Sequence, residues 1–185
     1  MTMNPSKFYR RTTAEQVIKL ETSRPDYTCA SPLKTIDVFS ENTQIEKLLK
    51  KRHSCRGFAE RAVEVNKIAA ICRASYSFNL YPVASAGGLY PLSIYFINRI
   101  GSNDFPRGVY QYDPFKDQIL LLRSELMDEE LFYSLNDSSF IFNSTCIFFI
   151  VADVARHNAK YSNRGYRHTL VEVILAQVAV QLILN

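Results

Sequence analysis

The spacing of apolar and polar residues predicts two helices in the first half of the chain. One begins near residue 43 and continues until Gly57 ends it, with three apolar residues on one face: Ile45, Leu48 and Leu49. A second helix over residues 63–76 carries four apolar residues at i, i+3, i+4, i+7 spacing: Val65, Ile68, Ala69 and Cys72. This stripe should face the core.

Strand patterns dominate the middle of the chain. Residues 92–100 have the aromatic and β-branched content of a strand, and residues 108–122 read as two strands joined by a turn. Residues 145–153 form a short unbroken apolar run, which predicts a strand buried on both faces. Helices are expected at 125–135 and from 154 onward. Because strands and helices alternate without βαβ spacing, we expect a mixed sheet covered by helices on both sides.

The longest apolar stretch, residues 170–184, is shorter than a membrane span and contains Glu172, Gln177 and Gln181. As a helix it would present apolar side chains on every side, so it should be buried in a core or an interface. Because the chain stops at Asn185, we expect the covering elements to be missing or to come from another subunit. Residues 1–40 read as an N-terminal arm, and 41–185 as one domain.

Composition fits a soluble globular protein: the chain has 185 residues, 47% of them hydrophobic, and a net charge of +4. Its basic residues are scattered, so nothing demands a nucleic-acid partner. The cysteines stand far apart and no secretory segment precedes them, which favours free thiols in a reducing cytoplasm; they are Cys29, Cys55, Cys72 and Cys146. The histidines lack metal-ligand spacing, so no metal site is expected.

Three segments carry candidate chemistry. In "RHSCR", Arg52, Ser54 and Arg56 alternate after a helix, where two guanidiniums and a hydroxyl could converge on a phosphate; the alternative is a solvated helix end that complements the helix dipole. In "ASAGGLYP", residues 84–91, paired glycines allow close backbone approach or positive φ, although an ordinary loop fits equally well.

In "AKYSNRGYRH", Lys160 stands beside Tyr161. A neighbouring ammonium lowers the pKa of a phenol by favouring phenolate, so either residue could carry a proton. The alternative is a solvated helix end.

Four motifs occur together and in order: "RHSCRGF", "ASAGGLYP", "GVYQYDP" and "KYSNRGYR". With them the chain resembles the flavin-dependent nitroreductase-like proteins and, among these, the SagB-type dehydrogenases, which oxidise thiazoline and oxazoline rings in peptides. The resemblance implies an α+β three-layer sandwich with a mixed, mainly antiparallel sheet, whose C-terminal part is missing here. It also implies FMN at the interface of a cytoplasmic homodimer.

The resemblance assigns roles residue by residue. By this resemblance the FMN phosphate is bound by Arg52, His53, Ser54 and Arg56. The isoalloxazine ring is contacted by Ser85, Ala86 and Gly87. Lys160 and Tyr161 match the catalytic pair: a base removes a ring proton while a hydride leaves the neighbouring carbon for the flavin, and which residue is the base stays open. The chain departs from the family at Tyr81, at Ala84 and in "VILAQVAVQ" after Glu172.

The expected function is therefore FMN-dependent oxidation of a peptide azoline to an azole in natural-product biosynthesis, with a cyclodehydratase-type partner. The sequence determines neither the substrate peptide nor whether the product is a thiazole or an oxazole. Two alternatives stay open. One is an NAD(P)H-dependent nitro- or quinone reductase. The other is a flavin-free scaffold subunit of a biosynthetic complex.

Overall fold

The computed structural model describes residues 43–55, 57–78, 83–125 and 143–183. By contacts the chain divides into two compact units, 1–39 and 40–185, and all described residues belong to the second. The predicted arm and the helix expected at 125–135 lie outside the described residues, apart from Glu125 itself.

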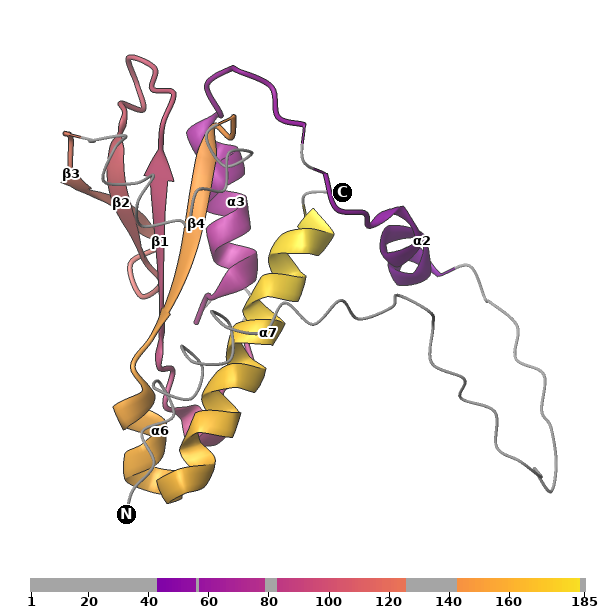
Figure 1. The fold of residues 1–185 in the computed structure, drawn as a ribbon, viewed down its shortest axis with the longest axis vertical. Coiled ribbons are helices and arrows are strands. Elements are labelled where there is room, and N and C mark those ends of the chain that lie inside the picture. Colours follow the sequence, from indigo (N-terminus) through magenta and orange to yellow (C-terminus); the bar gives the residue numbers. More distant parts are fainter. Residues whose placement is uncertain (1–42, 56, 79–82, 126–142, 184–185) are drawn as a thin grey trace, which may run out of the picture. The chain divides into compact units, whose positions relative to one another are not determined.

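Four strands form one sheet in the order β3-β2-β1-β4, and every pairing is antiparallel (Figure 1). The strands are β1 (Leu92–Asn98), β2 (Gly108–Asp113), β3 (Gln118–Arg123) and β4 (Cys146–Ala152). The predicted strand at 92–100, the hairpin over 108–122 and the strand at 145–153 are thus confirmed. The sheet is antiparallel where a mixed sheet was expected.

The core lies between one face of this sheet and two helices, α3 (Val65–Ser75) and α7 (Gly165–Ile183). Alternate residues of β1 and β2 point into it, because successive side chains of a strand face opposite sides. The sheet contributes Leu92, Ile94, Phe96, Tyr110 and Tyr112, and the helices contribute Ile68, Cys72 and Ala176. Figure 1 shows both helices on the same side of the sheet, so among the described residues the third layer does not appear.

Strand β4 is half buried, which corrects the prediction of burial on both faces. It is last in the strand order and pairs only with β1 among the described strands. Phe148 and Ile150 face the core, whereas Val151 on the opposite face is 50% exposed. The unbroken apolar run of β4 therefore belongs to a strand that lies at the edge of the described sheet and has one partly exposed face.

The first described helix, α2 (Gln44–Lys51), begins as predicted. Thr43 accepts a hydrogen bond from the Glu46 amide, and the Glu46 carboxylate accepts one in return from the Thr43 amide, which forms a capping box. The helix ends at Lys51, so its predicted continuation to Gly57 is wrong. Arg52 leaves helical geometry at ψ 122°, and the His, Ser and Cys that follow are weaker helix formers.

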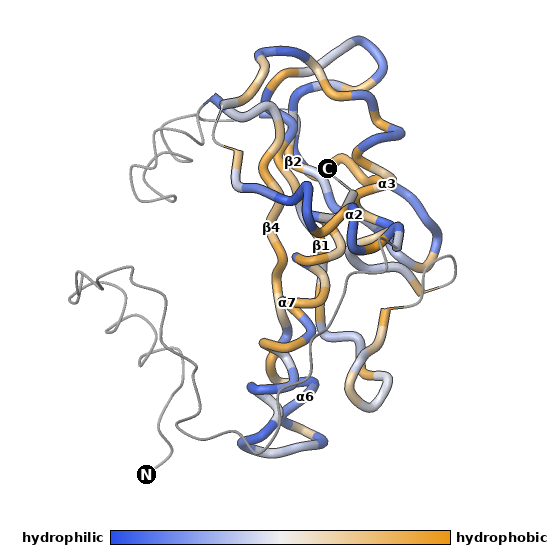
Figure 2. The backbone as a smooth tube through the Cα atoms, turned by 90° about the vertical axis from the view of Figure 1, so that its right-hand side faces the viewer, coloured by the Kyte–Doolittle hydropathy of each residue, from blue (hydrophilic) through white to orange (hydrophobic). Residues whose placement is uncertain are grey.

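Helix α7, expected to be covered on every side by a core or by an interface, is buried on one face within this chain. Its inner face carries Glu172 and Ala176, which are almost inaccessible to solvent. Its outer face carries a strip of four side chains that are 42% to 57% exposed: Val171, Ile174, Leu175 and Val178. Figure 2 shows this helix as mainly hydrophobic, next to the more hydrophilic α6 (Val154–Tyr161).

Candidate functional site

The "ASAGGLYP" segment forms a tight loop that ends at β1. Within it, Ala86–Gly88 make a short 3-10 turn, and both glycines have positive φ, 66° at Gly87 and 65° at Gly88. Ser85 holds the loop: its hydroxyl accepts a hydrogen bond from the Tyr90 amide, and its carbonyl accepts one from the Gly88 amide. The glycines are therefore needed for backbone conformation, since positive φ is costly for other residues.

The predicted catalytic pair lies against this loop. Asp153 caps α6, which ends in Lys160 and Tyr161, and the Lys160 ammonium approaches the Gly87 carbonyl at 3.4 Å. A Cβ atom on Gly87 would lie 2.5 Å from the Tyr161 hydroxyl and 2.7 Å from Lys160 Nζ. The absent side chain thus leaves room for these two groups, and the structure brings together two of the three predicted segments.

The predicted phosphate clamp follows α2 as an exposed, irregular stretch. Arg52 and Ser54 make no side-chain hydrogen bond or ion pair with other described residues, and His53 Nδ1 lies 3.0 Å from the Lys51 carbonyl. Arg56 lies outside the described residues. No hydrogen bond or ion pair among the described residues joins this stretch to the glycine loop.

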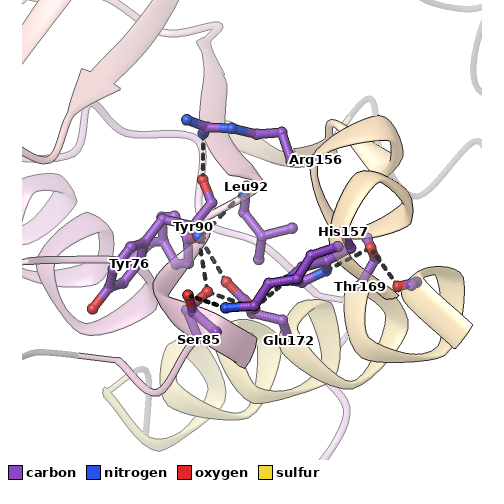
Figure 3. A network of polar contacts seen from close by, with 11 residues as sticks. Tyr76, Ser85, Tyr90, Leu92, Arg156, His157, Thr169 and Glu172 are labelled. Atoms are coloured by element: carbon purple, nitrogen blue, oxygen red, sulfur yellow. Dashed lines mark hydrogen bonds and ion pairs between the residues drawn. The ribbon is translucent and has the colours of Figure 1, made fainter. Parts of the chain in front are cut away.

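A buried polar network lies beneath the loop, and sequence reasoning missed it (Figure 3). At its centre Glu172, 2% exposed, accepts hydrogen bonds from the Tyr76 hydroxyl at 2.7 Å and the Ser85 hydroxyl at 3.0 Å. His157 Nε2 lies 3.7 Å from the same carboxylate. A lone acidic residue inside an apolar helix was the available signal, because such a residue needs buried partners.

Burial and the Glu172 carboxylate together raise the pKa of Tyr76, so this phenol stays protonated and donates to Glu172. The Ser85 side chain is likewise directed inward. The outer side of this loop therefore presents backbone atoms and the Ala86 methyl group, without the Ser85 hydroxyl.

A cavity of about 600 Å³ lies beside the loop, where Gly88 and Arg156 form part of its wall. Five aromatic residues line it: Tyr76, Phe78, Tyr90, Tyr112 and Phe115. Phe78 and Phe115 stack at 4.2 Å between ring centroids, and the Arg156 guanidinium donates to the Tyr90 carbonyl. Such walls suit an apolar or aromatic group.

Three cysteines carry free thiols: Cys55, Cys72 and Cys146. Cys29 lies outside the described residues. Within the described part of the chain, no group of three His, Cys, Asp or Glu is placed to hold a metal ion, and no helix is long and apolar enough to cross a membrane.

An antiparallel sheet with a helical layer and a glycine loop against a Lys-Tyr pair defines an α+β protein with a candidate active site. The Nitroreductase family matches residues 49–184, so the chain belongs to the nitroreductase family. It is thus an oxidoreductase of a family whose members typically bind FMN.

Similar proteins agree with this family. A Methanocaldococcus jannaschii protein provisionally named a nitroreductase is 29% identical over 137 residues, which cover 72% of this chain and 69% of that protein. A Ralstonia eutropha structure, also named provisionally as a nitroreductase, matches with a TM-score of 0.60 at 16% identity. The match covers 87% of this chain and 68% of the Ralstonia chain. A chain of the E. coli microcin synthetase McbBCD complex with truncated pro-MccB17 bound has a TM-score of 0.59 at 17% identity, with coverage of 99% and 68%. These structural likenesses show the fold.

Proposed function

We propose that the chain is an FMN-dependent dehydrogenase that oxidises thiazoline or oxazoline rings of a peptide to thiazole or oxazole. The observation that carries this proposal is the placement of Lys160 and Tyr161 against Gly87. Azoline oxidation must remove a proton as well as a hydride, so it requires a proton acceptor, and the Lys160–Tyr161 pair beside the glycine loop is placed to act as one.

The proposed reaction needs a proton acceptor, which the chain supplies, and a hydride acceptor, which is the cofactor. A ring C–H bond gives its proton to whichever of Lys160 and Tyr161 is in its unprotonated form, and the neighbouring carbon loses a hydride, so that a ring double bond forms. FMN, when bound, supplies the two-electron acceptor for that hydride. Lys160 Nζ and the Tyr161 hydroxyl lie on the same side of Gly87, so both can reach one substrate proton. The proton then passes to solvent, to which Lys160 is exposed.

The residues present fit FMN chemically. The Arg52 guanidinium and the Ser54 hydroxyl are exposed and make no bond to other described side chains, so both are available to a phosphate. A Cβ atom on Gly88 would meet nothing within 4 Å, so open space borders the loop there, as a flat ring would require. Arg56 would add a second guanidinium.

We assign two further partners. The aromatic cavity beside Gly88 suits an apolar part of an azoline-containing peptide made by a cyclodehydratase-type protein. The microcin synthetase complex supports this assignment, because its structure holds a truncated pro-peptide and its fold is similar. The exposed apolar strip on α7 supports a homodimer, in which a second copy would cover it.

The test is turnover of an azoline peptide by FMN-loaded protein with its cyclodehydratase-type partner, followed by mass spectrometry. Each oxidised ring loses two hydrogens. Lys160→Met and Tyr161→Phe should each lower turnover by about 10²- to 10⁴-fold while FMN stays bound. The matched control is Lys67→Met, which removes an exposed ammonium from α3.

Each alternative predicts a different result. Rapid reduction of bound FMN by NAD(P)H without peptide, unchanged in Lys160→Met, would show a nitro- or quinone reductase. Failure of the chain to bind FMN, combined with capture of the cyclodehydratase-type partner, would show a scaffold.

A further inference from the structure

The carboxylate of Glu172 is buried and accepts two hydrogen bonds. Each oxygen of its carboxylate accepts a hydrogen bond from a hydroxyl that itself accepts from a backbone amide. The Leu92 amide donates to the Tyr76 hydroxyl at 3.2 Å, and the Tyr90 amide donates to the Ser85 hydroxyl at 2.9 Å. Both hydroxyl protons therefore point at Glu172. Two converging donors match an ionised carboxylate and not a protonated one, which would bring its own proton to one of them.

A carboxylate that is 2% exposed needs an opposite charge, because burial of a lone anion costs several kcal/mol or more. Within the described part of the chain, the partner at ion-pair distance is His157, whose Nε2 lies 3.7 Å from Glu172 Oε2. His157 is fully buried, and its Nε2 has no hydrogen-bond partner among the described residues. A proton on Nε2 would bring positive charge within 3.7 Å of the carboxylate, whereas a ring without that proton would leave a lone pair at the same distance from the anion.

The surroundings of the second ring nitrogen favour a proton there too. His157 Nδ1 lies 2.9 Å from Thr169 Oγ1, and the Thr169 hydroxyl donates its one proton to the Gly165 carbonyl at 3.1 Å. With its one proton directed to Gly165, the Thr169 hydroxyl would be the acceptor in its contact with His157, which requires a proton on Nδ1. With protons on both nitrogens, the ring is an imidazolium.

We propose that His157 and Glu172 form a buried imidazolium–carboxylate pair that holds the glycine loop in register with Lys160 and Tyr161. Glu172 accepts a hydrogen bond from Ser85 in the loop, and His157 lies on α6 one turn before the proposed catalytic pair. Both are thus positioning residues. Their effect on turnover rests on the proposed function, whereas their charge state does not.

The surroundings of the pair are largely neutral. Tyr76 and Ser85 face Glu172, and Thr169 faces His157 Nδ1. The rings of Tyr161 and His168 each lie 6.1 Å from the His157 ring. No described Lys or Arg forms an ion pair with Glu172, so His157 is the group whose proton balances it.

The charge state can be read directly by ¹⁵N NMR. The chain has three histidines, and the variant His53→Gln/His168→Gln leaves His157 as the only imidazole. Neither replaced residue is buried, so this variant should fold. At neutral pH we expect two protonated ring nitrogens, and the added change Glu172→Gln should leave one unprotonated. One unprotonated nitrogen with Glu172 intact would overturn the pair.

A stability cycle tests the same pair without flavin. His157→Gln leaves a lone buried carboxylate, so the double variant His157→Gln/Glu172→Gln should unfold at a temperature closer to the wild type than His157→Gln does. His168→Gln serves as the matched control for loss of one imidazole. If the decreases in unfolding temperature of the two single variants simply add in the double variant, the ion pair is contradicted.

The positioning role is measured in the FMN-loaded enzyme. Glu172→Gln should lower kcat at least about tenfold with FMN still bound, because small displacements of catalytic groups are costly. An unchanged kcat would refute positioning. If the wild type binds no FMN, the proposed function fails, while the NMR experiment and the stability cycle still decide the pair.

Discussion

Gly87 shows how one missing side chain can serve two requirements. Its φ of 66° favours glycine, and its missing Cβ leaves space that the ends of Lys160 and Tyr161 occupy. Gly88 has the same backbone conformation but borders open space. The sequence suggested that both glycines make room for a flat ring. The structure separates them, since Gly87 lies against Lys160 and Tyr161, whereas Gly88 faces open space.

This difference gives a matched pair of variants. Gly87→Ala and Gly88→Ala should each cost about 1–2 kcal/mol of folding free energy, because both place a Cβ at positive φ. Gly87→Ala should in addition lower kcat for azoline oxidation by about 100-fold, since it displaces Lys160 and Tyr161. Thermal unfolding and single-turnover rates separate the two effects. Equal kcat values for the two variants would show that the contact with the pair is irrelevant.

The thiols should differ sharply in reactivity. Burial raises the pKa of Cys72 and of Cys146 to about 12, whereas Cys55 is exposed. Because the thiolate is the reactive form, iodoacetamide at neutral pH should label Cys55 and spare the buried Cys72 and the partly buried Cys146 in the folded chain. Peptide mass spectrometry reads the sites, and labelling after urea unfolding is the control. Rapid labelling of Cys72 in the folded chain would contradict its burial.

At the scale of elements, the β2–β3 hairpin is tied to α3 by one carboxylate. Asp117 accepts from Arg73 Nε at 2.8 Å and from the Tyr112 hydroxyl at 2.9 Å. The hydrogen bond from Arg73 is the main reason that the pKa of Asp117 lies below its ordinary value. Since the folded pKa is the lower one, the stabilisation is complete above the unfolded pKa and is lost as pH falls through the folded value.

Asp117→Asn tests this tie without straining the turn, because asparagine also tolerates the positive φ of 54° at this position. The variant should lose about 1 kcal/mol at neutral pH, a modest value because both partners are partly exposed. The difference from the wild type should shrink at an acidic pH below the lowered pKa of Asp117, where this carboxyl is protonated. Urea titrations at both pH values measure it. A difference that persists in acid would mean that charge is not the cause.

The elements that the sequence predicted correctly are those whose pattern is local. β1, the β2–β3 hairpin and α3 carry alternation or a helical stripe within themselves, and all were found. The predictions that fared less well concern how far neighbouring elements cover a strand or a helix. Whether Val151 or Leu175 is covered depends on which elements lie beside them, and the apolar pattern of β4 or α7 holds no such information.

The candidate site follows the same division. Lys160, Tyr161 and the glycine loop could be found because each belongs to a short contiguous motif. The network beneath them could not, because Glu172 meets Tyr76 and Ser85 across 96 and 87 residues of chain. The burial of His157 could not be predicted either, because it depends on the packing of α6 against α7.

At the scale of the whole molecule, the apolar strip of α7 is the feature that calls for a partner. Val171, Ile174, Leu175 and Val178 lie at the i, i+3, i+4, i+7 spacing of one helix face. Four half-exposed aliphatic side chains in a row are costly to leave in water, at about 25 cal/mol per Å² of apolar surface. A second copy of the chain can bury the same strip about a two-fold axis.

A dimer through this strip makes a direct prediction about mass. Wild-type protein should sediment at twice the 21.2 kDa of the chain, and Ile174→Lys should shift it to the monomer, because a charge cannot be buried in an apolar interface without a partner. Leu122→Lys on β3 replaces an equally exposed aliphatic residue outside the strip and should leave the dimer intact. If FMN binds at the subunit interface, Ile174→Lys should also release the flavin. A wild-type monomer, or a dimer that survives Ile174→Lys, would place any self-association on another face.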